Sequence, residues 1–222
     1  MEAKMISFFT MILFHVLILL LPIPGHSADS DPLQDFCIAD LQSPPHLNGF
    51  PCKPAFNVTS DDFFYSGLVN EANTSNLLGS YVTQANVLAF PGLNTLGISI
   101  NRVDIAVGGV THPHTHPRAT ECGVLIQGKL LVGLISSGNT VYSRNLSVGE
   151  VFVIPRGLVH FQMNVGEEKV LVFTAFNSQM PGTIQISRNL FGSVPPVPDQ
   201  ILAKAFQVNQ TLVDQIKSKF AA

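Results

Sequence analysis

Two short runs of glycines, histidines and other polar residues limit what this chain can fold into more than any other feature. The first run contains Gly108, His114, His116, Glu121 and Gly128. The second run contains Gly149, Pro155, Gly157, His160 and Asn164. Together they supply three histidines and one glutamate, side-chain types that bind transition metals. Two such runs in this order, about twenty residues apart, predict one metal centre inside a β-barrel.

The spacing within the runs allows the four side chains to meet. Residues two apart in a strand point to the same face, so His114 and His116 can both face the interior of a barrel. Glu121 has the wrong parity for the same regular strand, but the proline after His116 can end that strand. His160 lies on a later strand, which the turn at residues 155–157 introduces. A single histidine is more often structural, whereas the set of four predicts metal ligands.

These four candidate ligands define the chemistry that the site can support. Three neutral imidazoles and one carboxylate would give a divalent ion and its protein ligands a net charge of about +1. A six-coordinate ion would keep two positions for water, dioxygen, superoxide or a small carboxylate. Manganese, iron, nickel, copper and zinc all suit this set, so the residues alone leave the metal open. His112, two residues before His114, is expected at the entrance of the site rather than among the ligands.

From about residue 80 to residue 187 the chain reads as consecutive short strands bounded by Gly, Asn and Pro. Ile98, Ile100 and Ile105 are expected in the core, and residues 127–129 are expected to form a hairpin turn. The glycines of the two runs are expected where the chain turns sharply. Evenly spaced strands without a helical period predict an all-β fold, an antiparallel barrel or jelly roll.

The C-terminal segment follows a different period. After a proline-rich stretch at residues 195–198, apolar residues recur at helical spacing. Asp199 and Asn209 can cap two short amphipathic helices, which end near residue 220. Such helices need an apolar surface to pack against. A neighbouring subunit is the favoured interpretation, and the chain's own barrel is the alternative.

The N-terminal segment predicts export. Residues 1–27 read as a signal peptide, with an apolar run followed by prolines and by small residues suited to cleavage near Ser27 or Ala28. The alternative is a membrane anchor, but the run is short for a bilayer and helix-breaking prolines follow it. Residues 28–222 are expected to form one secreted domain that does not associate with membranes. A formal charge of −3 gives no basic surface for nucleic acid.

The cysteines agree with an oxidising compartment. Cys37 and Cys52 enclose a loop-like arm rich in Pro, Asn and Gly, and a disulfide between them would stabilise the fold by about 3 kcal/mol. Cys122 lies on the opposite side of its strand from Glu121 and is expected to be a small buried apolar residue.

Four asparagines stand in sequons for N-glycosylation, which also fits a secreted chain. Asn57 and Asn73 lie in polar, loop-like surroundings and are the favoured acceptors. Asn145 lies close to a predicted strand and Asn209 near a predicted helix start, so both are less favoured.

The wider sequence resembles one family. The two runs match the two cupin motifs, and the sequence around them resembles the germins and germin-like proteins of plants. The segments that carry the resemblance are PLQDFCIADL (32–41), NTLGISINRVDI (94–105), HTHPRATE (114–121), GEVFVIPRGLVHFQMNVG (149–166), FNSQMPG (176–182), LFGSVPPVP (190–198) and SKFA (218–221). They cover essentially the whole chain after the predicted signal peptide.

The resemblance implies a cupin jelly-roll barrel with short C-terminal helices and a disulfide-tied N-terminal arm. It implies a manganese ion, Mn2+, held by four residues: His114, His116, Glu121 and His160. It also implies the Cys37–Cys52 disulfide, secretion to the apoplast, and a homohexamer built as a trimer of dimers. In such an assembly the C-terminal helices lock neighbouring barrels together.

The resemblance also bears on activity. Germins oxidise oxalate with dioxygen to carbon dioxide and hydrogen peroxide, whereas many germin-like proteins dismute superoxide. Asn101 matches the oxalate-handling germins and is expected to point toward the metal. Those germins carry a second asparagine in an Asn-Pro-Pro-His sequence, which here reads Thr111-His112-Pro113-His114. A threonine hydroxyl cannot offer the two donors of an amide, which disfavours oxalate.

We therefore expect a secreted, manganese-dependent oxidoreductase of plant defence or the cell wall, which makes hydrogen peroxide by dismuting superoxide. Oxalate oxidation is the alternative for the same site and also involves a small-molecule substrate. An alternative of another class is a non-enzymatic apoplastic protein of defence, storage or ligand binding, because a fold alone does not establish catalysis.

Overall fold

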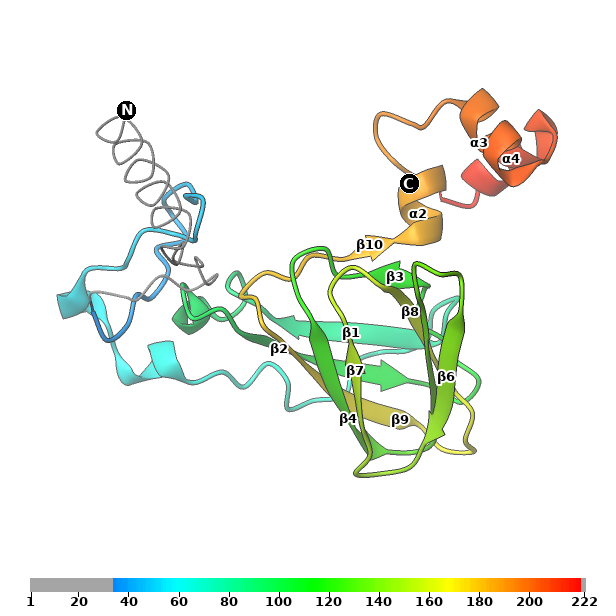
Figure 1. Ribbon diagram of the computed structural model, residues 1–222. Helices are drawn as coiled ribbons and strands as arrows, with labels where there is room; N and C mark the ends of the chain where they lie inside the picture. The colour runs from blue at the N-terminus through cyan, green and yellow to red at the C-terminus, as the bar shows by residue number, and fades with distance from the viewer. Residues whose placement is uncertain (1–33, 221–222) are drawn as a thin grey trace, which may run out of the picture. The chain divides into compact units, whose positions relative to one another are not determined.

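Two five-stranded antiparallel sheets make up most of the regular structure in residues 34–220, the part of the chain that a computed structural model describes (Figure 1). The first sheet has, in spatial order, the strands β1 (Ser80–Ala85), β2 (Ser99–Ile105), β9 (Val170–Phe176), β4 (Glu121–Gln127) and β7 (Val151–Ile154). The second has β10 (Ile184–Gln185), β3 (His114–Thr115), β8 (Val159–Asn164), β5 (Leu130–Ile135) and β6 (Val141–Leu146). The predicted all-β fold is confirmed. The predicted signal peptide, residues 1–27, lies outside the described residues, and the domain limits 28–222 stay a prediction.

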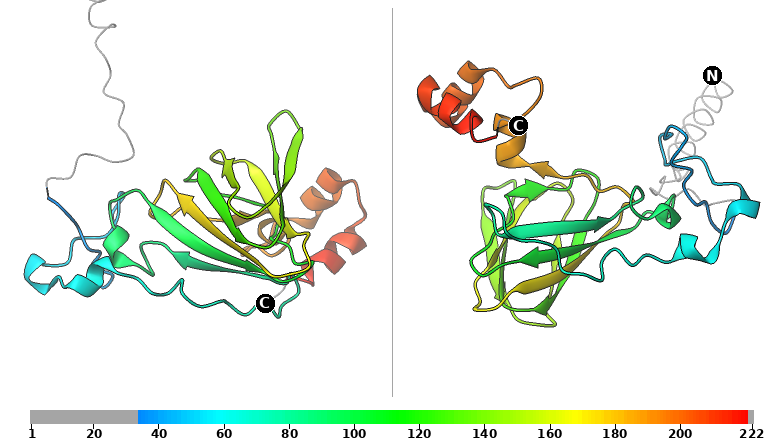
Figure 2. Two further views of the ribbon diagram at one scale, coloured as in Figure 1. Left: turned by 90° about the horizontal axis from the view of Figure 1, so that it is seen from below. Right: turned by 180° about the vertical axis from the view of Figure 1, so that it is seen from behind.

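Alternation along the strands separates the inner face of each sheet from its outer face. In β9, Val170 and Val172 are at most 1% exposed, whereas Leu171 and Phe173 are half-buried. The inward residues form one apolar core, which includes Val103, Ile105, Leu125, Leu130, Val170 and Val172. Each fully buried side chain of this size stabilises the fold by about 1.5–3 kcal/mol. The two sheets that enclose the core can be followed from two further directions in Figure 2.

Strand β2 corrects part of the predicted core. Ile105 is buried as expected, but Ile98 and Ile100 are 53% and 38% exposed. The reason is parity, because the odd-numbered residues of β2 carry the inward side chains. Ile100 therefore faces outward, and Ile98 precedes the strand.

The outer face of the first sheet carries an exposed apolar row that crosses four strands. Cys122 is in register with Ala175 and with Val153, and Ala175 is in register with Ile100. All four residues are exposed, so the prediction that Cys122 is buried is wrong. Alternation placed Cys122 correctly opposite Glu121, but apolar residues occupy both faces of this sheet.

The predicted hairpin at residues 127–129 is also wrong. Strand β4 pairs with β7 and β9, whereas β5 pairs with β6 and β8, so this turn connects the two sheets. Gly128 has a φ of 86°, and a Cβ on it would lie 2.7 Å from Cγ2 of Val170. Gly149 has a φ of 87°. Both glycines thus occupy turns that a side chain would strain, as predicted.

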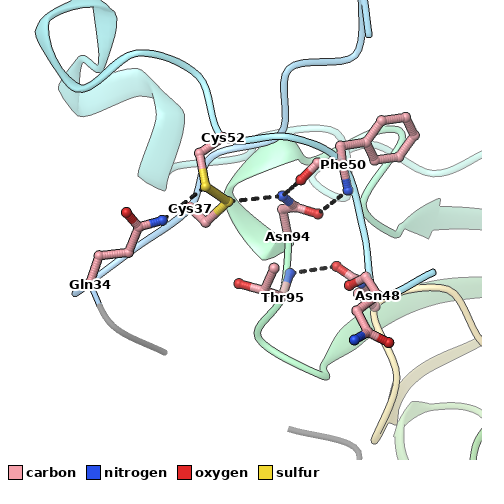
Figure 3. Close-up of a disulfide and its surroundings, with 8 residues drawn as sticks. Gln34, Cys37, Asn48, Phe50, Cys52, Asn94 and Thr95 are labelled. Carbon is pink, nitrogen blue, oxygen red and sulfur yellow. Dashed lines mark hydrogen bonds between the residues drawn. A yellow bond between two sulfur atoms is a disulfide. The ribbon is translucent and has the colours of Figure 1, made fainter. Parts of the chain in front are cut away.

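A disulfide closes a loop within the N-terminal arm, and one buried asparagine ties this arm to the rest of the described chain (Figure 3). Cys37 and Cys52 form the predicted disulfide. Asn94 is 0% exposed and exchanges two hydrogen bonds with the backbone of Phe50, at 2.9 and 3.0 Å, while its Nδ2 also donates to Sγ of Cys37. Short 3-10 helices flank these contacts: η1 (Ala55–Asn57), η2 (Ser60–Phe63) and η3 (Pro91–Leu93). The predicted disulfide-tied arm is confirmed.

Three short helices close the described chain: α2 (Ile186–Phe191), α3 (Asp199–Phe206) and α4 (Gln210–Lys217). Helices α3 and α4 match the prediction, and the Asn209 side chain caps α4 by accepting from Leu212 N at 2.9 Å. Asp199 does not cap α3, because it is the first residue inside the helix and bonds to Lys217 instead. Helix α4 contacts both α2 and α3, and the rings of Phe191 in α2 and Phe206 in α3 lie 5.4 Å apart. The three helices gather in one cluster in Figures 1 and 2. Within residues 34–220, every helix is too short or too polar to cross a bilayer.

Candidate metal centre

The four candidate ligands come from both sheets. His114 lies in β3 and pairs directly with His160 of β8, while His116 follows β3 by one residue. Glu121 begins β4 in the facing sheet. A turn directly after His116 separates the two strands, which explains the wrong parity of Glu121. One ligand atom from each residue lies within 4.8 Å of the others, so the structure brings together all four residues selected from the sequence.

Backbone carbonyls fix the tautomer of all three histidines. The three Nδ1 atoms lie 2.7, 2.6 and 3.0 Å from carbonyl oxygens, in the pairs His114–His112, His116–Gly182 and His160–Leu158. A carbonyl oxygen only accepts hydrogen bonds, so each Nδ1 must carry a proton. In a neutral ring, Nε2 then presents a lone pair, which is the arrangement that a metal-binding histidine needs.

One carboxylate oxygen lies close to two of these Nε2 atoms. Oε2 of Glu121 is 3.1 Å from Nε2 of His116 and 3.0 Å from Nε2 of His160. The lone pairs of neutral imidazoles repel a carboxylate oxygen at this separation unless a proton or a cation lies between them. A metal ion would satisfy all three atoms together, and three nitrogens with one oxygen suit a divalent transition metal. The donor set therefore fits a metal ion.

Burial and mutual contact set the charge states of these residues. Glu121 is 2% exposed and His160 is 0% exposed. Burial alone would raise the pKa of Glu121, but its contacts with His116 and His160 outweigh burial and lower that pKa to about 2. Burial, together with the neighbouring His160, lowers the pKa of His114 to about 4. At neutral pH the Glu121 carboxylate is ionised and the His114 ring is neutral, as metal binding requires.

Gln162 supports the site and was missed in the sequence. It is 2% exposed, and its Nε2 lies 3.5 Å from Oε1 of Glu121, the oxygen that does not approach the histidines. Its backbone exchanges two hydrogen bonds with Thr111, one of them to the Thr111 hydroxyl at 2.9 Å. Gln162 lies two residues after His160 on the same face of β8, so period-two alternation could have identified it.

Three of the four candidate ligands, His114, His116 and Glu121, line a cavity of about 380 Å³, while His160 is fully buried behind its wall. Asn101, Thr111 and His112, which the sequence placed beside the site, all line the same cavity. Asn101 is 6% exposed and Thr111 is 7% exposed. Burial lowers the pKa of His112, and the positive charge of Arg188 in α2 lowers it further. The residues that distinguish oxalate-handling germins thus lie where they can contact a small ligand.

The four sequon asparagines lie away from this cavity. Asn57, Asn73, Asn145 and Asn209 are all exposed. Asn145 belongs to β6, an edge strand, and Asn209 caps α4. Exposure permits glycosylation at every one of them, so the preference for Asn57 and Asn73 stays a prediction.

Comparison with known proteins identifies the relatives of this chain. Residues 66–214 match the model of the Cupin family. Germin-like protein subfamily T member 2 of Arabidopsis thaliana is 53% identical over 208 residues, which cover 94% of each chain. The rhicadhesin receptor of Pisum sativum is 53% identical over 86% of this chain and 88% of its own length. Among solved structures, recombinant oxalate oxidase in complex with glycolate is 51% identical, covers 87% of this chain and 98% of its own, and superposes with a TM-score of 0.84.

The resemblance seen in the sequence is thereby confirmed. The family match spans most of the chain, including both runs with the four clustered residues. The germin-like relative matches almost from end to end. The chain belongs to the cupin family and, within it, to the germin-like proteins.

Proposed function

We propose that His114, His116, Glu121 and His160 hold one Mn2+ and that the protein is a manganese-dependent oxidoreductase that dismutes superoxide to dioxygen and hydrogen peroxide. The observation that carries the proposal is the common orientation of the three histidines. Each ring is held by a carbonyl at Nδ1, which leaves Nε2 free beside a buried, ionised carboxylate. Manganese is chosen because of the germin-like family, since the donor set alone suits several metals.

The protein residues have separate roles in this proposal. When bound, a manganese ion supplies the two oxidation states through which one superoxide is oxidised and the next is reduced. The three histidines and Glu121 hold the ion, and the Nδ1 hydrogen bonds keep the rings in place. Gln162 orients the Glu121 carboxylate through Oε1. Asn101 and Thr111 line the cavity in which the substrate is received, and the two protons consumed for each peroxide come from solvent.

Thr111 is the reason for preferring superoxide over oxalate. Its hydroxyl oxygen already accepts a hydrogen bond from Gln162 N, which leaves one O–H donor where oxalate-handling germins carry an amide with two. Superoxide is smaller and does not need a second pair of donors. Oxalate oxidation is the second candidate, favoured by Asn101 in the cavity and by the 51% identity with oxalate oxidase.

The test is one preparation assayed for both substrates. Protein expressed with its signal peptide and loaded with manganese should consume superoxide faster than it oxidises oxalate. His114→Ala should lose both metal and activity, while His46→Ala removes an exposed histidine of the N-terminal arm and should retain both. Superoxide consumption that survives removal of the metal would refute the proposal. Oxalate turnover at a higher kcat/KM than superoxide would favour the second candidate.

A non-enzymatic role is the candidate of another class. The rhicadhesin receptor, by its name a binding protein, has the same 53% identity to this chain as the germin-like relative, over 86% rather than 94% of this chain. A fully loaded metal site with no turnover of superoxide or oxalate would support ligand binding, storage or defence without catalysis.

We also propose that the protein is secreted to the apoplast and forms a homohexamer, a trimer of dimers. The disulfide and the apolar N-terminal segment support secretion. The exposed apolar row on the first sheet supports subunit contacts, since soluble monomers rarely expose such a face. Light scattering coupled to size-exclusion chromatography should give a mass close to six chains. A monomeric mass would refute the hexamer, and retention inside plant cells would refute secretion.

A further inference from the structure

Among the residues that the structure describes, the metal cavity contains one Lys or Arg side chain, and it forms no ion pair with a carboxylate there. Arg188 of α2 lines the cavity together with His114, His116 and Glu121. Its side chain is exposed. The Lys and Arg ion pairs within residues 34–220 use other cations: Lys53, Arg102, Arg144, Lys169 and Lys217. The guanidinium of Arg188 therefore keeps its full charge available to a ligand in the cavity.

Helix α2 is held against the segment that carries the histidines. The backbone N–H of Ile186 donates to the carbonyl oxygen of Pro113 at 3.0 Å, and Pro113 lies between His112 and His114. Arg188 is thus fixed by its backbone beside the ligand-bearing strand.

The charge balance of the cavity favours anions. Glu121 is the only carboxylate among the residues that line the cavity in the described chain. With a divalent ion bound, the ion, Glu121 and Arg188 together carry a net charge of about +2. A cavity with walls of low dielectric concentrates such a field and attracts anions from solution.

We propose that Arg188 is a specificity-determining residue that selects small anions for the metal site. This inference rests on the proposed function in that it concerns the same cavity, and it names the class of ligand. Superoxide and oxalate are both anions, so the selection applies to either reaction. An arginine can bind a carboxylate through two hydrogen bonds, whereas superoxide is attracted mainly by the charge.

The test compares wild type, Arg188→Gln and Arg188→Lys with the control Lys129→Gln. Lys129 is exposed in the connection between β4 and β5 and does not line the cavity. Its substitution changes the net charge by the same amount. The probe is oxalate, titrated into manganese-loaded protein by calorimetry at low and at high sodium chloride. The second-order rate with superoxide is measured on the same samples, and metal content is checked in each.

Arg188→Gln should weaken oxalate binding about tenfold at low salt, and the difference should shrink at high salt because mobile ions screen an exposed charge. The superoxide rate should fall about three- to tenfold with the same salt dependence. Arg188→Lys should retain most of the affinity and rate, and Lys129→Gln should match wild type. Metal content should be equal in all four proteins.

Equal oxalate affinity and superoxide rate in Arg188→Gln and wild type would overturn the proposal. An equal loss in Arg188→Gln and Arg188→Lys that does not depend on salt would assign Arg188 a packing role and overturn it too. A failure of the proposed function can be distinguished from a failure of this inference. Binding of oxalate that depends on Arg188, in a protein that turns over neither oxalate nor superoxide, would refute the reaction and support anion selection.

Discussion

The interior of the barrel has two halves of opposite character built on the same strands. In one half, inward positions of β2, β4 and β9 are apolar: Val103, Ile105, Leu125, Val170 and Val172. In the other half, inward positions of these strands are polar and equally buried: Ser99, Asn101, Glu121 and Thr174. Two pairs of residues follow this division, Ile105 with Val170 and Asn101 with Thr174. Phe176 is an apolar exception in the polar half, since it is buried and pairs with Ser99 and Glu121. The apolar half stabilises the fold by burial, whereas the polar half supplies the side chains of the site. The two functions should therefore be separable by mutation.

The largest effect is expected in the polar half. Glu121→Gln removes the only carboxylate among the four proposed ligands. Loss of a residue that merely hydrogen-bonds to a metal ligand lowers metal affinity by up to about a hundredfold, so loss of a ligand itself should lower manganese affinity by at least that much. The metal-free variant should also be less stable than metal-free wild type at neutral pH, because the lowered pKa of Glu121 means that its ionised form stabilises the fold. Metal analysis and urea unfolding of the metal-free protein check both statements. Retention of manganese at wild-type affinity would remove Glu121 from the ligand set.

The converse is expected in the apolar half. Leu125 is 0% exposed, and Leu125→Ala should lower the free energy of unfolding by about 2–5 kcal/mol through the cavity it leaves. Manganese stoichiometry should stay the same, since Leu125 is not among the residues that line the metal cavity. Leu77 is fully exposed, and Leu77→Ala should change stability by less than about 0.5 kcal/mol. Loss of metal in Leu125→Ala at temperatures where it is folded would show that the halves are coupled.

Acid should destabilise the metal-free protein through the polar half. The pKa of His114 is about 4 in the folded chain, below its ordinary value of 6.5, so the unfolded chain takes up the proton first as pH falls. The contribution of neutral His114 to the free energy of unfolding is fully present above pH 6.5 and is lost progressively as the pH falls to 4. Glu121 adds a further loss from pH 4.5 toward pH 2. Urea midpoints from pH 8 to about 4 should fall in wild type and in the control His46→Asn, and should fall less in His114→Asn. The same slope in all three would contradict this origin.

The sequence predicted the polar half better than the apolar half. Histidine and glutamate at fixed spacing have few other uses inside a barrel, so all four candidate ligands were found. Isoleucines are less informative, because this sheet carries apolar residues on both faces. Ile100 and Cys122 were therefore placed in the core when they lie outside it. The prediction of a hairpin at Gly128 was wrong, because a glycine permits a turn but does not determine whether the two flanking strands pair with each other. Helix α2 was not predicted from the sequence, so the position of Arg188, which lines the cavity from this helix, was not predicted either.

The smallest effect is expected for two amides that cross the boundary between the halves. Gln162 and Asn164 lie two apart on the inner face of β8, and both are nearly fully buried. Gln162 contacts Glu121, whereas Nδ2 of Asn164 donates to the carbonyl oxygens of Ile105, Ala106 and Glu168. These contacts assign Gln162 to the site and Asn164 to the fold.

Gln162→Leu should lower manganese affinity about tenfold, the lower end of the range for an outer partner, because its contact with Glu121 is long at 3.5 Å. Asn164→Leu should destabilise the protein, because the carbonyl oxygens of Ile105, Ala106 and Glu168 lose the amide donor and the N–H of Gly166 loses its acceptor. Its manganese affinity should equal that of wild type. Calorimetric titration of manganese and urea unfolding of both variants give the comparison. An equal loss of metal affinity in both would mean that the polar half depends on the packing of the whole strand, and the boundary drawn between Gln162 and Asn164 would not hold.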